Sequence, residues 1–482
     1  MRKLEIWVLL LILLGAFLVR LYKFDNPIAD WHSWRQSDTS AVSRNFVKFG
    51  FDLLHPKHDD LSNVASGYDN PKGYRFVEFP IYNAAQAGLF KAFGHFTLEQ
   101  WGRLVTIFSS LISTVFLYLI VKKHKSKLAG FLAAFFFAFL PYNIYYGRVI
   151  LADTSMVAAI LGGIYFFDKW LSAKNFQFSI FNFQFSLALA FTALSFLLKP
   201  YAIFFTIPMV YIAFEKFGFY FIKKWQLWLF FIISLAPLVF WRLWMLQYPE
   251  GIPVTDWLFN GGNIRFKGAF FYWIFADRIG SLILGYWGVV LLVLGVLVRE
   301  DRKNGLFFLS FLASSLLYLT VMARGNVQHD YYQILIVPSI AIFLGLGSVF
   351  LLKAQNENLS KASCYLAFVI CSLFMFSFGW YNVRDYFNIN NSSIVIAGEV
   401  ADKLTPRDAK IIANYNGDTS FLYQTKRKGW ASFEKPIPEM IDMGASYLVL
   451  VNPTKNDYGI GKTYKIVSAT KDYILFDLHK NP

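Results

Sequence analysis

The sequence predicts a polytopic α-helical membrane protein with a small α/β domain at its C-terminal end. Of its 482 residues, 56% are hydrophobic and 16% are charged, whereas about 25% charged residues is usual in soluble domains. Long apolar stretches follow one another as far as Tyr381, and most approach the roughly 20 residues that cross the hydrocarbon core of a bilayer. After Trp380, short apolar runs with strand and helix patterns replace them.

About eleven stretches are expected to span the membrane. The first has the charged start of a signal peptide, but no small-residue cleavage site follows Arg20, so we expect an uncleaved helix. One stretch, 201–214, is short, and Lys199-Pro200 before it indicates two helices that meet at a polar break. The expected spans are 4–22, 104–121, 128–146, 149–167, 180–198, 201–214, 227–246, 279–298, 306–322, 332–352 and 362–380.

The distribution of basic residues predicts the orientation. Lys and Arg concentrate in alternate short loops, such as Lys122-Lys123-His124-Lys125-Ser126-Lys127, and such loops face the cytoplasm. The polar segment 25–99 and everything after Trp380 are therefore expected on the outer face. The net charge of +15 follows from this orientation. A nucleic-acid-binding protein would instead carry a basic face with base-stacking aromatics on a soluble domain.

Two domains are expected, 1–382 with the spanning helices and the outer loop 25–99, and 383–482 as the outer α/β domain. In the loop, Ala41, Val42, Phe46 and Phe49 recur at helical spacing, which predicts an amphipathic helix along the membrane surface. A second loop helix is expected at 81–93, after the turn signals at 69–73. In the C-terminal domain, the pattern predicts helices at 394–404 and 437–443 and strands at 410–413, 447–451 and 473–478.

Asp38 is the candidate catalytic residue. It lies in Trp34-Arg35-Gln36-Ser37-Asp38-Thr39, in a long polar loop at the expected water interface. A carboxylate there can act as a general base that takes a proton from an acceptor hydroxyl. Alternatively, Ser37 or Asp38 caps the following helix by accepting hydrogen bonds from its free backbone amides.

Three cations are candidates for binding a phosphate group. Arg35 and Arg44 flank Asp38, and arginine binds two oxygens at once through its planar donors. Each arginine could instead pair with the carboxylate or contact a lipid headgroup. Lys199, at the polar break, is the third, and its alternative is a lysine that extends to the membrane interface.

Two further acids are candidates for substrate binding. Glu78 is flanked by apolar residues, where an unpaired charge is energetically unfavourable. It is therefore expected to bind an acceptor hydroxyl or a metal ion, or to form an ion pair with Arg75 or Lys72. Asp153 follows Arg148 by five residues at the start of a span, and both could line the same cavity. The simpler interpretation of Asp153 is an acid stabilised by the helix dipole.

His329 and Tyr331, in Gln328-His329-Asp330-Tyr331-Tyr332-Gln333, are candidates for lining the donor pocket, and an interfacial aromatic belt is the alternative.

One dense group of side chains of the types that bind metals matches no standard metal-site spacing. No metal ligand is therefore assigned and no cofactor is expected, and a bound divalent ion is the weaker alternative. That group is Asp52, His55, His58, Asp59 and Asp60.

Taken together, these motifs resemble the GT-C glycosyltransferases. The closer likeness is to members of glycosyltransferase family 39 type, akin to bacterial protein O-mannosyltransferases and to the aminoarabinose transferases of lipid A. It covers about residues 1–380. The matching pieces are Arg35-Gln36-Ser37-Asp38-Thr39, Arg44-Asn45-Phe46, Glu78-Phe79-Pro80-Ile81-Tyr82, Arg148 with Asp153, and His329-Asp330-Tyr331-Tyr332.

The resemblance implies an inverting transfer of a sugar from a polyprenyl-phosphate carrier to a lipid, glycan or protein acceptor, on the outer face of a bacterial inner membrane. Asp38 then takes the position of the catalytic aspartate. Two features depart from the pattern. Many relatives have Asp-Glu where this chain has Asp38-Thr39, and relatives of the lipid A type place a basic residue before a Pro-Pro pair where this chain has Glu78-Phe79-Pro80.

Other functions fit the sequence less well. A transporter or lipid flippase is the main alternative, but it needs polar residues near the middle of its spans, and here the ionisable residues gather at the outer ends. A non-catalytic scaffold leaves the first loop unexplained. A lipid-linked polymer ligase would share the donor type and the side of the membrane.

Overall fold

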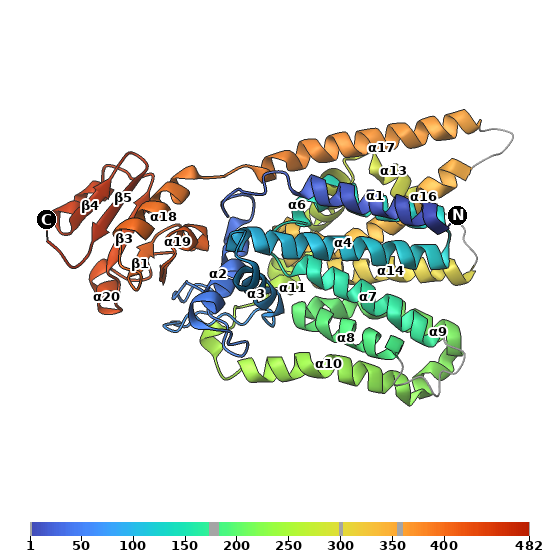
Figure 1. The fold of residues 1–482 in the computed structure, drawn as a ribbon, viewed down its shortest axis with the longest axis horizontal. Coiled ribbons are helices and arrows are strands. Elements are labelled where there is room, and N and C mark those ends of the chain that lie inside the picture. Colours follow the sequence, from blue (N-terminus) through green and yellow to red (C-terminus); the bar gives the residue numbers. More distant parts are fainter. Residues whose placement is uncertain (1, 173–182, 298–301, 354–359, 482) are drawn as a thin grey trace. The chain divides into compact units, whose positions relative to one another are not determined.

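The computed structural model describes residues 2–172, 183–297, 302–353 and 360–481. The chain divides into two compact units, which Figure 1 shows as a helical bundle and a mixed α/β part. The first unit comprises Met1–Tyr22, Leu104–Trp241 and Thr255–Asp385, and the second comprises Lys23–Arg103, Arg242–Val254 and Tyr386–Pro482. The second unit therefore groups the polar segment after the first helix with the C-terminal strands.

The first unit is built from helices, most of them apolar along their length. The closest packing joins α7 to α8, α13 to α16, and α5 to α16. Shorter 3-10 segments include η2 (Pro200–Thr206) and η7 (Asp330–Ile336), and η6 (Tyr272–Ile283) is π-helical. The helices are α1 (Arg2–Arg20), α4 (Leu98–His124), α5 (Lys127–Phe139), α6 (Pro141–Tyr146), α7 (Asp153–Leu171), α8 (Phe183–Leu198), α9 (Ile207–Phe217), α10 (Trp225–Met245), α11 (Trp257–Asn260), α12 (Gly268–Phe271), α13 (Gly288–Leu297), α14 (Arg302–Val321), α15 (Ala323–Gln328), α16 (Val337–Lys353) and α17 (Lys361–Val383).

Within the described residues, six helical segments are long and apolar enough to cross a membrane, or seven if the bent pair Gly268–Ile283 and Gly288–Leu297 forms one span. The expected number of eleven is therefore not confirmed. Helices occupy each expected span, but several are short: α5 has 13 residues and stops before Pro141. The polar break is present, since Lys199 is extended between α8 and η2. The start of span 180–198 and the end of span 279–298 lie outside the described residues.

Two glycines allow α13 and α16 to touch. A Cβ atom on Gly295 would lie 1.9 Å from the carbonyl oxygen of Phe343, and one on Gly347 would lie 2.0 Å from that of Leu291. Any larger side chain at either position would force the helices apart. Small residues serve the same purpose in the interfaces of membrane helices generally.

The second unit contains a five-stranded mixed sheet in the order β2-β1-β3-β5-β4. β1 runs parallel to β2 and β3, whereas β5 runs antiparallel to β3 and β4. The strands are β1 (Lys410–Ala413), β2 (Lys428–Trp430), β3 (Tyr447–Val451), β4 (Lys465–Ala469) and β5 (Tyr473–Asp477), and the helices that follow the polar segment are α18 (Ser392–Leu404), α19 (Thr419–Gln424) and α20 (Ile437–Asp442). The predicted strands at 410–413 and 447–451 are confirmed, but α19, β2 and β4 were not predicted.

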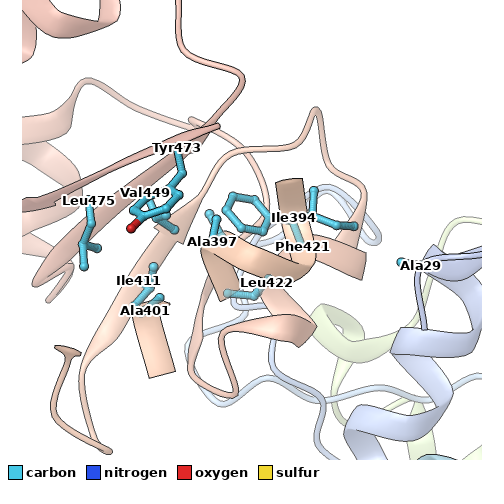
Figure 2. Packing of buried hydrophobic residues seen from close by; sticks show 11 residues of the cluster. Ala29, Ile394, Ala397, Ala401, Ile411, Phe421, Leu422, Val449, Tyr473 and Leu475 are labelled. Atoms are coloured by element: carbon cyan, nitrogen blue, oxygen red, sulfur yellow. The ribbon is translucent and has the colours of Figure 1, made fainter. Parts of the chain in front are cut away.

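Both faces of this sheet are buried except at the edge strand β4, which is mostly exposed. Alternate residues of a strand point to opposite faces, so Ile411 packs with Phe421 and Leu422 of α19 on one face, as Figure 2 shows. Its neighbour Ile412 packs with Met440 of α20 on the other face. Helices therefore cover the inner strands on both sides.

The polar segment is tied to this sheet through its backbone. Leu61 donates its N–H to the carbonyl oxygen of Gly429 at 2.7 Å, and Gly429 donates to that of Asp59 at 3.0 Å. The segment thus continues the sheet beyond β2 with a parallel bridge between Asp60 and Gly429.

Two helices form within the polar segment, α2 (Ser33–Phe49) and α3 (Ile81–Phe93). The predicted bounds of the second are confirmed. On α2, Val42 and Phe46 pack against Ala87 of α3, as the helical spacing predicted. Phe49 is the exception: its side chain is 70% exposed, because it lies in the last turn, beyond this contact.

A tight turn at Gly73 directs the chain after it. The side chain of Asn70 bridges the turn, accepting the N–H of Tyr74 and donating to its carbonyl oxygen, both at 2.9 Å. Gly73 has a φ of 68°, and a Cβ atom there would lie 2.8 Å from the carbonyl oxygen of His58. Glycine adopts this left-handed conformation without steric cost.

We expect Gly73→Ala to lower the free energy of unfolding by about 1 to 2 kcal/mol from the positive φ, and further through the clash with His58. Thermal unfolding of the purified full-length protein in detergent measures the effect. Gly67→Ala is the matched control, since Gly67 has a φ of 83° but open space around it. An equal loss in both variants would show that the close approach to His58 is unimportant.

Candidate functional site

Asp38 lies inside α2 and not at its start. The helix begins at Ser33, after His32 in the left-handed conformation, so Asp38 is the sixth helical residue. The backbone N–H groups that need a cap belong to the first turn. The interpretation of Ser37 or Asp38 as a helix cap is therefore wrong, and the carboxylate is available for other contacts.

Three residues from distant parts of the second unit surround the Asp38 carboxylate. Arg75 Nη2 donates to Oδ2 at 2.6 Å, and the hydroxyl of Thr419, the first residue of α19, donates to Oδ1 at 2.8 Å. His58 Nδ1 lies 3.8 Å from Oδ1. The side chain is only 4% exposed, so these groups replace water as its solvation.

The environment favours the ionised form of Asp38. Burial alone would raise the pKa of the carboxyl, but Arg75, His58 and Arg35 outweigh it and hold the pKa below its usual value. Asp38 is therefore a carboxylate at neutral pH, and an ionised carboxylate only accepts hydrogen bonds.

Arg35 pairs with Glu78. Its Nη2 atom lies 2.5 Å from Glu78 Oε1, and both side chains are mostly buried. The sequence suggested Arg75 or Lys72 as a partner of Glu78. The partners are exchanged because the turn at Gly73 directs Arg75 to Asp38, which leaves Glu78 facing α2.

Arg44 is held between Asp59 and Tyr423. It forms an ion pair with Asp59, donates to the carbonyl oxygen of Tyr423 at 3.0 Å, and lies 3.8 Å above the Tyr423 ring. Tyr423 in turn donates to Glu99 at 2.5 Å and shares a hydrogen bond of 2.9 Å with Ser40. These contacts join α2 to α19.

The dense group of metal-type side chains is dispersed among separate partners. Asp52 pairs with His55 at 3.0 Å, Asp59 with Arg44, and Asp60 with Ser62 at 2.6 Å. No group of three or more His, Cys, Asp or Glu side chains in the described residues could hold a metal ion.

In the first unit, Lys199 and Asp153 form a buried pair. Lys199 Nζ lies 3.4 Å from Asp153 Oδ1. Tyr201 lies beneath the ammonium group, and its ring is about 6 Å from those of Tyr318 and Tyr332. Lys199 is buried with an acid and so does not extend to the membrane interface. Asp153 is in the first turn of α7, which also agrees with stabilisation by the helix dipole.

His329 belongs to an aromatic cluster in the same unit. Its ring stacks on those of Tyr331 and Tyr332 at 5.5 and 6.2 Å between centroids, and Trp257 lies edge-on at 5.9 Å. Both tyrosines are buried, which disagrees with a lipid-facing aromatic belt. Arg148, also buried, donates to the carbonyl oxygen of Tyr22.

The nine candidate residues thus fall into two groups. Arg35, Asp38, Arg44 and Glu78 are in the second unit, and Arg148, Asp153, Lys199, His329 and Tyr331 are in the first. The sequence did not reveal that Arg75, Thr419 and Tyr423 contact this machinery. Asp418 caps α19 through the N–H of Ser420, a pattern that predicts a helix start but not its proximity to residue 38.

Comparisons with known proteins agree with this architecture. A family model described as dolichyl-phosphate-mannose-protein mannosyltransferase matches residues 77–244, about a third of the chain. No curated protein matches the sequence.

Solved structures match over much more of the chain. ArnT from Cupriavidus metallidurans bound to undecaprenyl phosphate has a TM-score of 0.67 and 12% identity, over 98% of this chain and 97% of that one. The oligosaccharyltransferase AglB from Archaeoglobus fulgidus, in complex with an inhibitory peptide and a dolichol-phosphate, has a TM-score of 0.57 and 12% identity, over 92% and 69%. The arabinofuranosyltransferase AftD from Mycobacteria has a TM-score of 0.61 and 12% identity, and this chain spans 40% of its length.

The chain has the fold of these three solved structures, which agrees with the resemblance to the GT-C glycosyltransferases. ArnT is a particular protein whose fold it matches over nearly the whole of both chains.

We expect Arg75→Met to lower the free energy of unfolding by about 3 kcal/mol, because it leaves a buried carboxylate without its main cation. Arg75→Lys retains the charge and should lose less. In the double variant Arg75→Met with Asp38→Asn, the orphaned charge is absent and part of the stability should return. Thermal unfolding of wild type, Arg75→Met, Asp38→Asn and the double variant measures this coupling, and simple additivity of the two single losses would contradict the pairing.

The lowered pKa of Asp38 also predicts a pH dependence. The pKa of the folded state is below the unfolded value of about 4, so ionisation contributes stability that is fully present above that value and is lost as pH falls through the folded pKa. The difference in Tm between wild type and Asp38→Asn should stay constant from about pH 7 to 5 and shrink below about pH 4. A difference that changes between pH 7 and pH 5 would contradict this assignment.

Proposed function

We propose that the protein is an inverting glycosyltransferase that moves a sugar from a polyprenyl-phosphate carrier to a hydroxyl group of a lipid, glycan or protein, at the outer face of a bacterial inner membrane. The observation that carries the proposal is the buried Asp38 carboxylate, held by Arg75 and Thr419, in a chain with the GT-C fold. Two of the matching structures contain a polyprenyl or dolichyl phosphate, which supports the type of donor.

In the proposed reaction, the acceptor oxygen attacks the anomeric carbon as the bond from that carbon to the carrier phosphate breaks. Asp38 takes the hydroxyl proton, and the electron pair of the broken bond stays on the phosphate. A carboxylate with a low pKa is a weak base, so it takes this proton late, once bond formation has made the hydroxyl acidic. Arg75 and Thr419 orient the carboxylate throughout.

Lys199 is our candidate for stabilising the departing phosphate. Arg35 and Arg44 each form a short ion pair with a carboxylate. Each pair weakens the attraction of its arginine for a second anion. Lys199 sits further from its acid, at 3.4 Å, in a buried site lined by tyrosines. A cation in such a site interacts strongly with developing charge.

The test is sugar transfer in membranes that contain the protein, supplied with a panel of polyprenyl-phosphate sugars. Asp38→Asn should lower the transfer rate by about 100-fold or more, the range for removing a general base, while donor binding is retained. The matched control is Asp472→Asn, which changes a carboxylate in the C-terminal domain outside this network and should leave the rate unchanged.

Equal transfer by wild type and Asp38→Asn would exclude Asp38 as the base. If wild type consumes no donor of the panel, a transporter or lipid flippase becomes the better hypothesis.

A further inference from the structure

The second unit contains a cavity of about 700 Å³ next to the last turn of α2. This volume is within the range of pockets that bind small molecules, about 300 to 1,000 Å³. None of the residues assigned above to the transfer reaction lines it. Six cationic side chains do: Lys48, Arg407, Lys410, Lys426, Arg427 and Lys428.

The cations outnumber the acids of the cavity. The acidic lining residues are Asp402 and Asp408, and Asp402 pairs with both Lys426, at 2.8 Å, and Arg427, at 2.7 Å. The cavity therefore has an excess of positive charge.

Three lysines of the lining contribute to this excess, as does Arg407. Lys48 donates to the carbonyl oxygen of Lys426 at 3.0 Å, and Lys410 to that of Met443 at 3.4 Å. In the described part of the chain, neither these two nor Lys428 has a carboxylate within ion-pair distance. Burial lowers the pKa of both Lys48 and Lys428, and nearby cations lower it further, whereas Asp59 opposes them. A bound anion would reduce the repulsion between the cations.

Two neutral residues of the lining suit a sugar ring. Phe49 presents a ring that is 70% exposed, 5.1 Å from Lys428 Nζ, and an aromatic face packs well against the C–H groups of a pyranose. Asn45 is 4% exposed and uses its amide nitrogen on the carbonyl oxygen of Lys57 at 2.9 Å. Its Oδ1 atom accepts no hydrogen bond from the described residues, so it can accept one from a sugar hydroxyl.

We propose that this cavity binds an acidic saccharide, a sugar unit that bears a phosphate or carboxylate group. The lysine and arginine side chains would bind the acidic group, the Phe49 ring would pack against the sugar ring, and Asn45 would accept a hydrogen bond from a sugar hydroxyl. If the proposed function holds, this acidic unit belongs to the acceptor; this assignment rests on that function. Lys48 follows Asp38 by ten residues on α2, about 15 Å along the helix axis, so the acceptor extends beyond a single sugar, with its acidic unit in the cavity and a free hydroxyl toward Asp38.

Direct binding tests this inference without any donor or reaction. The full-length protein, in an uncharged detergent that has no sugar headgroup, is titrated by calorimetry with tetragalacturonate, with phosphorylated pentamannose and with neutral maltotetraose. We expect one or both acidic saccharides to bind, more weakly as salt is added, and the neutral one not to bind.

The variant Lys410→Gln with Lys428→Gln should weaken binding by about tenfold or more, as expected for the loss of charged hydrogen bonds. Phe49→Ala should also weaken it, and since that side chain is exposed, folding is not at risk. The matched control is Lys455→Gln with Lys471→Gln, which removes two exposed lysines of the same unit outside the cavity and should bind as wild type does.

Equal loss in the control variant, or equal binding of acidic and neutral saccharides, would overturn the inference. The inference would also be overturned if a lipid headgroup occupied the cavity. In that case, phosphatidylglycerol nanodiscs would protect Lys428 from chemical labelling, and no saccharide would bind. Asp38→Asn should bind the acidic saccharide normally, so failure of the transfer reaction and failure of this site are distinguishable.

Discussion

The buried charge of Asp38 is the constraint on which the second unit depends. Moving a carboxylate out of water costs several kcal/mol unless cations and hydrogen-bond donors replace its hydration. Those donors come from positions 37 and 381 residues away along the chain. The turn at Gly73 positions the first, and the docking of α19 on the sheet positions the second. Strand pairing between Asp60 and Gly429 holds these two parts together.

Buried ion pairs also form at two other positions along α2 and hold that helix in place. Arg35 bonds to Glu78, and Arg44 bonds to Asp59 and stacks on Tyr423. Each of these charges is buried with its partner, so removing either member leaves an uncompensated ion. A helix anchored at three turns in this way can keep a carboxylate in one orientation, which proton transfer at a defined oxygen requires.

Local features of the structure could be predicted from the sequence, and pairings could not. Periodicity identified α3 and two strands because each extends over enough residues to show its repeat. β2 has only three residues, too few to show a repeat. The exchange of partners between Arg75 and Arg35 had no sequence signal, since each acid lies three residues from the cation that it does not pair with and 37 or 43 residues from the one that it does. No local sequence pattern could predict the contact between Thr419 and Asp38. The number of spans is not confirmed, because several of the apolar stretches are interrupted by breaks such as Leu140-Pro141 and do not form one long helix.

The separation of 381 residues between Asp38 and Thr419 also sets the time that passes between the synthesis of these two residues. At about 5 to 20 residues per second, a ribosome needs roughly 20 to 80 s to reach Thr419 after making Asp38. Throughout that interval the carboxylate lacks one of its donors, and the parallel bridge to Gly429 has no second strand. A nascent chain that has already inserted every membrane helix is therefore still incomplete at Asp38. This site is therefore completed only after the helical bundle has been synthesised, so a chain that terminates before Thr419 carries the bundle without the finished carboxylate.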